Sequence, residues 1–155
     1  MTGADRIEDA RGLATIDVEE TGRLGVVIQS FEQDAVLLVN KGPAGHWLEV
    51  VLRGKGGNTD AIGARLVAEA GGRKQLRDVT TTAGYLSGVS RVVHFGLGDG
   101  TAVEKLTVRW PDARVETFER VAADRRIVIV EGEGIADRSK AAPGDGKERI
   151  RPNGE

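Results

Sequence analysis

The stretch DVEETGRLG, residues 17–25, has the residue types and spacing of a calcium-binding loop. Asp17 and Glu19 place carboxylates at alternate positions, and Gly22 follows where such loops turn, as in the pattern D-x-[DN]-x-[DN]-G. An EF-hand is excluded because Ile28 stands where the bidentate glutamate of that motif should be. The same residues also fit a polar β-turn in which Asp17 accepts hydrogen bonds from nearby backbone N–H groups.

A second group of polar residues could contact a ligand or a partner. Asn58 and Asp60 lie in a loop before Gly63, and Tyr85 follows a glycine further along the chain. The loop residues also suit an Asx-type turn, in which Asn and Asp bond their own backbone, and we favour that interpretation. Tyr85 fits equally an exposed binding aromatic or a residue that caps the core. Asn58, Asp60 and Tyr85 are therefore the candidate ligand or partner surface.

Catalytic residues are not predicted. His46 and His94 are the two histidines, each beside an aromatic residue in an apparent strand, so packing is expected rather than a metal pair. Ser87 and Ser90 stand in LSGVS, which is not a G-x-S-x-G nucleophile elbow. The glycine-rich GLGDG at residues 96–100 lacks the lysine of a phosphate loop and is expected to be a turn between strands.

The elements that would hold these residues are short apolar runs rich in β-branched side chains, without a sustained helical period. Glycine is frequent, at 22 of 155 residues, and separates the runs, as in a protein with many tight turns. Gly71-Gly72 between two runs predicts a hairpin. We expect an all-β fold, an antiparallel sandwich or a barrel-like domain of about seven or eight strands. The predicted core is Leu48, Val50, Leu52, Ile62, Leu66, Val92, Phe95, Leu97, Leu106, Val108, Trp110, Phe118, Ile127 and Ile129.

Composition limits the class of protein. Hydrophobic residues make up 39% and charged residues 30% of the chain, and the net charge is −2, which gives no general attraction to nucleic acid or anionic membrane. The chain contains no cysteine, so disulfides and zinc–thiolate sites are excluded. It has no apolar run long enough to cross a membrane, and MTGADRIEDARG has no apolar core of signal-peptide length. Neither nucleic-acid binding nor membrane insertion is expected.

The two ends differ from the middle. Residues 132–155 hold few large apolar side chains and cannot bury enough surface to offset the entropy of ordering, so a disordered tail is predicted. Residues 1–11 are also expected to be poorly ordered.

Five phrases, taken in order, resemble the ASPIC/UnbV domain family. They are HWLEVVLRG, NTDAIGARL, GYLS, HFGLGDG and VEKLTVRWPDARVETF, and the resemblance covers residues 46–131. The chain departs from the family's pattern at Ala113, where a glycine is usual, which is expected to change the hairpin turn rather than the function. Members of this family typically follow a β-propeller of FG-GAP/VCBS repeats. Residues 12–40 resemble the last such repeat, here reduced to a residual blade hairpin.

The resemblance also bears on calcium. In the propeller repeats the ligands resemble D-x-D-x-D-G-x-x-D. On this chain Asp17 is kept, Glu19 is a longer carboxylate, Thr21 is a neutral hydroxyl and Gly25 replaces the last carboxylate. Arg23 adds positive charge inside the loop. The resemblance therefore implies a degenerate site, and we expect no cofactor and no bound calcium.

As a function, the resemblance implies a non-catalytic interaction or adhesion module at the C-terminal end of a secreted propeller protein. Its partner would be a protein or matrix component, in an extracellular or periplasmic location. The alternative is a carbohydrate-binding module with Tyr85 and residues 55–60 at its site. An enzyme would need paired carboxylates in a cleft and ranks last.

Overall fold

The computed structural model describes residues 9–136, which form strands and turns without a helix. The first three strands make a separate sheet in the order β1-β2-β3. Their bounds are β1 Ala10–Ile16, β2 Gly25–Ser30 and β3 Val36–Leu38. The remaining strands form two four-stranded sheets and one small hairpin.

One four-stranded sheet has the order β11-β10-β5-β6 and is antiparallel throughout. Its strands are β5 Arg65–Ala70, β6 Arg73–Asp78, β10 Ala102–Arg109 and β11 Val115–Ala122. The predicted hairpin at Gly71-Gly72 is confirmed, because both glycines adopt positive φ between β5 and β6. Alanine is found at the equivalent turn between β10 and β11, where Ala113 has φ +71°.

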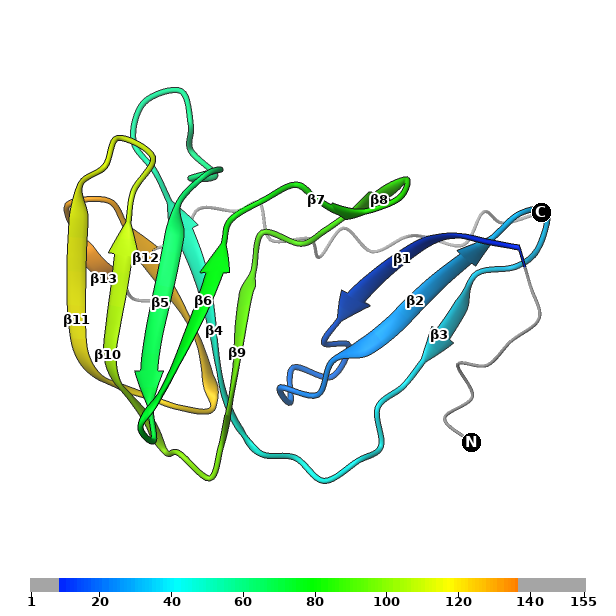
Figure 1. Ribbon diagram of the computed structural model, residues 1–155, viewed down its shortest axis with the longest axis horizontal. Helices are drawn as coiled ribbons and strands as arrows, with labels where there is room; N and C mark the ends of the chain where they lie inside the picture. The colour runs from blue at the N-terminus through cyan, green and yellow to red at the C-terminus, as the bar shows by residue number, and fades with distance from the viewer. Residues whose placement is uncertain (1–8, 137–155) are drawn as a thin grey trace, which may run out of the picture.

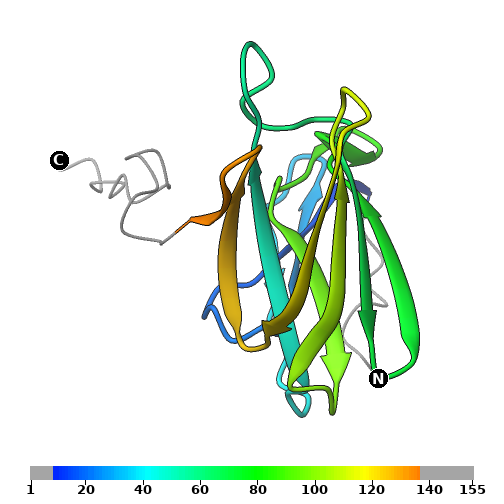
Figure 2. The ribbon, with the colours of Figure 1, turned by 90° about the vertical axis from the view of Figure 1, so that its left-hand side faces the viewer.

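The other four-stranded sheet has the order β13-β12-β4-β9. Its strands are β4 His46–Arg53, β9 Val93–Gly98, β12 Arg125–Val130 and β13 Gly134–Ala136. The β4–β12 pair is parallel, while β4–β9 and β12–β13 are antiparallel. Figures 1 and 2 show the two sheets stacked as layers, with the N-terminal sheet to one side. The all-β prediction is confirmed, and the domain is a sandwich rather than a closed barrel.

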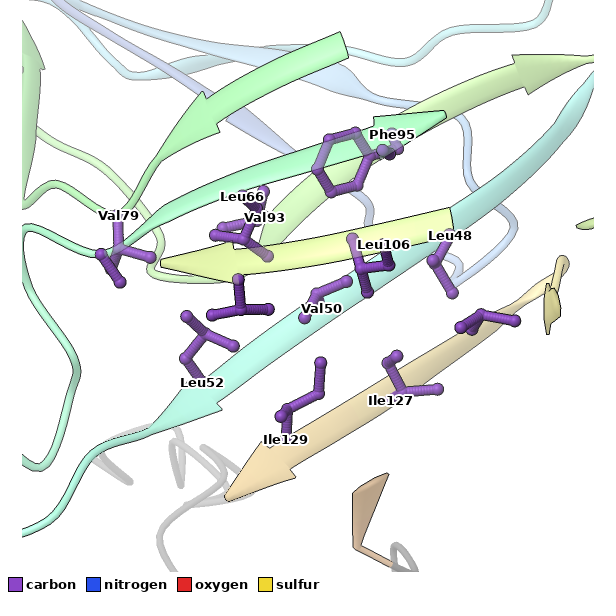
Figure 3. Close-up of a cluster of buried hydrophobic side chains, with 14 of the residues drawn as sticks. Leu48, Val50, Leu52, Leu66, Val79, Val93, Phe95, Leu106, Ile127 and Ile129 are labelled. Carbon is purple, nitrogen blue, oxygen red and sulfur yellow. The ribbon is translucent and has the colours of Figure 1, made fainter. Parts of the chain in front are cut away.

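The core lies between the two layers, where alternate side chains of facing strands point inward (Figure 3). β4 is buried on both faces, as its continuous apolar run predicts. The fully buried side chains at the centre of the core include Leu48, Val50, Phe95, Leu66, Leu106 and Ile129. Both tryptophans are buried, at 9% exposure for Trp47 and 1% for Trp110.

Three predictions about the fold need correction. Ile62 is 42% exposed, because it lies in a loop whose inward positions are taken by Ala61 and Ala64. The N-terminal unit has three strands and not a two-stranded hairpin, because residues 10–16 also pair with β2. Ala10 and Arg11, expected to be poorly ordered, begin this strand.

The C-terminal boundary also lies later than predicted. Residues 134–136 form β13 against β12, although the sequence analysis placed them in the tail. The rest of the predicted tail, residues 137–155, and residues 1–8 lie outside the described residues. Within residues 9–136 there is no helix of the length and apolar character needed to cross a membrane.

Candidate functional site

The loop at residues 17–25 connects β1 to β2 and closes on itself. The Asp17 carboxylate accepts hydrogen bonds from the backbone N–H groups of Thr21, at 3.1 Å, and Gly22, at 2.5 Å. Glu19 forms an ion pair with Arg23 at 3.2 Å. Both candidate carboxylates are thus engaged by groups of the loop itself. Among residues 9–136, no three acidic or histidine side chains gather in a way that could hold a metal ion.

The same loop joins the N-terminal sheet to the sandwich. The carbonyl of Gly22 lies 3.0 Å from His94 Nε2, and the His94 ring stacks on Trp47 with an interplanar angle of 6°. Gly22 lies directly on the Trp47 indole, and a Cβ at this position would overlap the ring. The Glu20 carboxylate lies 3.5 Å from Arg126 of β12. The loop therefore acts as a docking loop, and His94 takes part in packing as predicted.

A buried ion pair lies beneath this contact. Arg126 Nε donates to Glu49 Oε2 at 2.7 Å, and the Glu49 side chain is only 4% exposed. The two residues are register partners in the parallel β4–β12 pair. A buried carboxylate requires such a partner, because an unpaired charge in the interior is costly. This pair was not predicted from the sequence, although a glutamate within the apolar run HWLEVVL indicates a buried charge.

A cleft of about 420 Å³ opens between the N-terminal sheet and the sandwich. Its apolar walls include Ile16 and Val27 on one side and Val89 and Val92 on the other. The polar groups at its surface belong to Asp17, Ser90, His94, Glu49 and Arg126. Most of these groups already bond within the chain, so the cleft offers apolar surface rather than a set of reactive groups.

A small hairpin lies beside the cleft and carries the two most exposed large hydrophobic side chains of residues 9–136. Its strands are β7 Thr82–Gly84 and β8 Ser87–Gly88, and Figure 1 shows it reaching from the sandwich toward β1. Tyr85 and Leu86 form its tip and are 69% and 76% exposed. The predicted ambiguity for Tyr85 is resolved in favour of exposure.

The tip is held in place by Ser87. Its hydroxyl donates to the carbonyl of Tyr85 at 2.8 Å and accepts from the backbone N–H of Leu13 in β1, also at 2.8 Å. Leu86 adopts φ +47°, a left-handed conformation that bulky residues rarely take. A strained and exposed leucine serves no packing purpose, which makes the tip a candidate for binding. The sequence analysis named Tyr85 but not Leu86, because strain at a turn is not visible from residue type.

The polar loop at residues 54–64 is a separate feature. The Asn58 side chain donates to the carbonyl of Ile62 and accepts from its N–H, at 2.9 and 3.0 Å. Asp60 lies between two cations, 3.6 Å from Arg53 and 3.3 Å from Arg91. These contacts give the Asx-type turn that the sequence favoured. Figures 1 and 2 show this loop at the end of the sandwich, away from the hairpin tip, so Tyr85 does not join Asn58 and Asp60 in one site.

Comparisons with known proteins match the sandwich to a family. A family model described as "ASPIC and UnbV" matches residues 54–136, the sandwich from the end of β4 to β13. The chain is 36% identical over 128 residues to cartilage acidic protein 1 of Xenopus tropicalis. That alignment includes 77% of this chain and 19% of the relative, so the chain spans about a fifth of the relative's length.

Proposed function

The chain belongs to the ASPIC and UnbV family, and on that basis we propose that it is a non-catalytic protein-interaction module of a secreted, adhesion-type protein. The relative's name connects it with cartilage, and we extend an extracellular or periplasmic location to this chain from that name. We further propose that β1–β3 derive from the last FG-GAP/VCBS repeat of a propeller. The three-stranded sheet that precedes the matched domain supports this assignment.

The observation that carries the proposal is the exposed pair Tyr85 and Leu86 at the tip of an anchored hairpin. Aromatic side chains dominate protein interfaces because they offer much contact area for little entropy. The adjacent cleft, with its valine and isoleucine walls, would accept an apolar side chain of the partner. The partner is then a protein or matrix component that covers the tip and the mouth of the cleft.

A catalytic role is not proposed. The hydroxyl of Ser90 accepts the N–H of Val92, and that of Ser87 anchors the hairpin. The Glu49 carboxylate is neutralised by Arg126. Each of these groups has a structural use, which supports a binding module over an enzyme.

The test is cross-linking from the tip. A photoreactive phenylalanine at position 85 should capture a partner from the extracellular proteins of the source cells. The same group at Val115, which is 58% exposed on β11, serves as the control position. With the purified partner, Tyr85→Ser and Leu86→Gly should each weaken binding about tenfold or more, as expected of central interface residues. Val115→Ser should have no effect, and equal capture at both positions would overturn the proposal.

Carbohydrate binding is the second candidate, because the exposed ring of Tyr85 could stack on a sugar. A glycan array separates the two functions. Binding to a defined glycan that Tyr85→Ala abolishes, without any protein captured at position 85, would favour the carbohydrate-binding module.

A further inference from the structure

The sandwich has an open side between the edge strands β6 and β9 (Figure 1). Two side-chain contacts cross this opening within the described residues. Gln75 Nε2 donates to the carbonyl of Gly96 at 2.7 Å, and the Arg77 guanidinium lies 5.7 Å from the centroid of the Phe95 ring. A groove of about 510 Å³ follows the opening and is lined by residues of both strands. We call this feature the β6–β9 groove.

Within the described residues, no strand pairs with β9 on the side of this groove. β9 pairs with β4 on its other side, and the Gly96 carbonyl points away from β4, toward Gln75. Backbone groups alternate in direction along a strand, so His94 presents its N–H and C=O groups to the same side as Gly96, while beyond Gly96 the register with β4 shifts at a β-bulge. An edge strand of this kind, whose outward backbone groups pair with no other strand, is a template for an additional strand.

Gly96 has no role inside the chain that requires glycine. Its φ is not positive, and a Cβ built on it would meet no atom within 4 Å. By contrast, Gly98 at the end of the same strand has φ +62° and needs its flexibility. A glycine within a strand often marks a site where another backbone or a ligand approaches closely.

Two arginines of β6 bring positive charge to this side of the sandwich: Arg73 lines the groove, and Arg77 lies over the Phe95 ring. Arg73, Gln75 and Arg77 pair with the buried residues Ala70, Ala68 and Leu66, so their side chains lie on the inner side of β6, toward β9. Arg73 and Arg77 are four residues apart, about 13 Å along the strand, which is also the distance between side chains four residues apart in an extended peptide. The neighbouring acids Glu69 and Asp78 are already paired, with Lys74 and Arg65.

We propose that the β6–β9 groove binds an extended peptide with acidic side chains four residues apart, which adds a strand to the free edge of β9. The acidic side chains of the peptide pair with Arg73 and Arg77, and its backbone takes the place of Gln75 on the Gly96 carbonyl. This proposal rests on the proposed function of an interaction module, and it names a second surface and the chemistry of its partner.

The experiment measures fluorescence anisotropy of labelled eight-residue peptides added to the full chain. A peptide of alternating valine and glutamate should bind, and one of alternating valine and lysine should not. The Arg73→Glu/Arg77→Glu variant should have about tenfold or more lower affinity for the acidic peptide, because like charges repel across an interface. The same variant should now bind the lysine peptide, because opposite charges attract. That reversal also shows that the variant is folded. Arg109→Glu, an exposed charge reversal on β10, is the matched control and should change neither affinity.

Two further measurements test the added strand itself. Gln75→Ala should raise the affinity for the acidic peptide several-fold, because the Gln75 amide no longer competes with the peptide for the Gly96 carbonyl. Methylation of alternate peptide nitrogens should abolish binding, because it removes the N–H groups that a strand donates. The proposal would be overturned if the charge-neutral variant Arg73→Gln/Arg77→Gln bound the acidic peptide with wild-type affinity, or if the methylated peptide bound as well as the unmethylated one.

Failure of this proposal is distinguishable from failure of the proposed function. Leu86→Gly should leave peptide binding unchanged, and the Arg73/Arg77 variants should leave cross-linking from position 85 unchanged. If the chain captures a partner through its tip but binds neither peptide, the proposed function stands and the proposal for the β6–β9 groove fails. A third outcome is that the chain binds chondroitin sulfate but neither peptide, and that the charge-reversed variant does not bind it. The ligand of the groove would then be a glycan, and the peptide proposal would be overturned.

Discussion

Asp17 is the residue of the docking loop that most resembles a calcium ligand, and both of its carboxylate oxygens already accept backbone N–H groups. A bound cation would have to coordinate these oxygens while they accept the hydrogen bonds, together with the Glu19 carboxylate that Arg23 holds. The hydrogen bonds and the ion pair close the loop on itself, which supports the prediction that it does not depend on calcium.

We predict that excess calcium does not raise the thermal stability of the chain above its value in chelator. A site occupied at 100 times its Kd would add about 2.7 kcal/mol, which thermal unfolding detects easily. Asp17→Ala should cost about 1–2 kcal/mol, since it removes two accepted hydrogen bonds, and the cost should be equal in calcium and in chelator. A calcium-dependent cost would show that the loop binds the ion.

Asp112 shows how a turn residue couples stability to pH. Its side chain bonds to the Arg114 guanidinium and N–H, and these bonds lower the pKa of Asp112 below its usual value. The folded state therefore binds fewer protons than the unfolded state between the two pKa values. The contribution is complete above the ordinary aspartate pKa of about 3.9 and is lost as pH falls through the lowered folded value.

Asp112→Asn should accordingly reduce the decrease in the free energy of unfolding that accompanies acidification. Thermal unfolding from pH 6 to pH 2 is the measurement, and the wild type should lose more stability than the variant below about pH 4. High salt should narrow the difference, because the pair is exposed to solvent. Parallel curves for the two proteins would contradict this account.

At the scale of single elements, β4 and β12 show both what the sequence could predict and what it could not. Their apolar runs, HWLEVVLR and RRIVIV, identify two buried strands. Their parallel register, which brings Glu49 beside Arg126, depends on the packing of residues 77 apart in sequence. A charge within an apolar run marks a pair, but its partner can be found only from the topology.

Arg126→Gln should destabilise the chain by about 3 kcal/mol, because it leaves the Glu49 carboxylate buried without a partner. Glu49→Gln/Arg126→Gln should recover part of that loss, since no unpaired charge remains. Arg125→Gln, at the exposed neighbouring position, is the control and should lie within about 0.5 kcal/mol of the wild type. Urea unfolding measures all three, and equal costs at 125 and 126 would contradict the role of the pair.

The errors in the predicted fold occur at the ends of elements. Ile62 was assigned to the core by its type, yet the Asx-type turn at Asn58 directs it outward. β13 was missed because its three residues, GIA, carry no alternation and pair only where β12 provides an edge. Turns and edges are set by neighbours distant in sequence, and apolar periodicity does not contain that information.

For the whole molecule, the central question is how the N-terminal sheet is held on the sandwich. The docking loop places Gly22 on Trp47 and Glu20 beside Arg126, while Ser87 joins the hairpin to β1. The cleft exists only because these contacts fix two units against each other. Its residues come from distant segments, so the sequence identified Asp17 as a candidate but not the arrangement of the cleft around it.

A comparison of Gly22→Ala with Gly56→Ala should distinguish the contact of the docking loop with Trp47 from the cost of backbone strain alone. Both Gly22 and Gly56 have positive φ, but only a Cβ at position 22 would meet another side chain. Gly56→Ala should cost about 1–2 kcal/mol from the left-handed conformation alone. Gly22→Ala should cost about 1–3 kcal/mol more, because Trp47 or the loop must move. Hydrogen exchange should show increased opening of β1–β3 in Gly22→Ala only, and equal exchange in both variants would contradict the docking.

The parallel pairing of β12 with β4 has a consequence for synthesis of the protein. Arg126 follows its partner Glu49 by 77 residues, so β4 leaves the ribosome long before β12 exists. At about 5–20 residues per second, the apolar strand waits on the order of 4–15 s for its neighbour. Pairings so distant in sequence also form slowly once the chain is free. During this interval the β12 edge of β4 has no partner, although β9, which pairs with the other edge, is synthesised earlier.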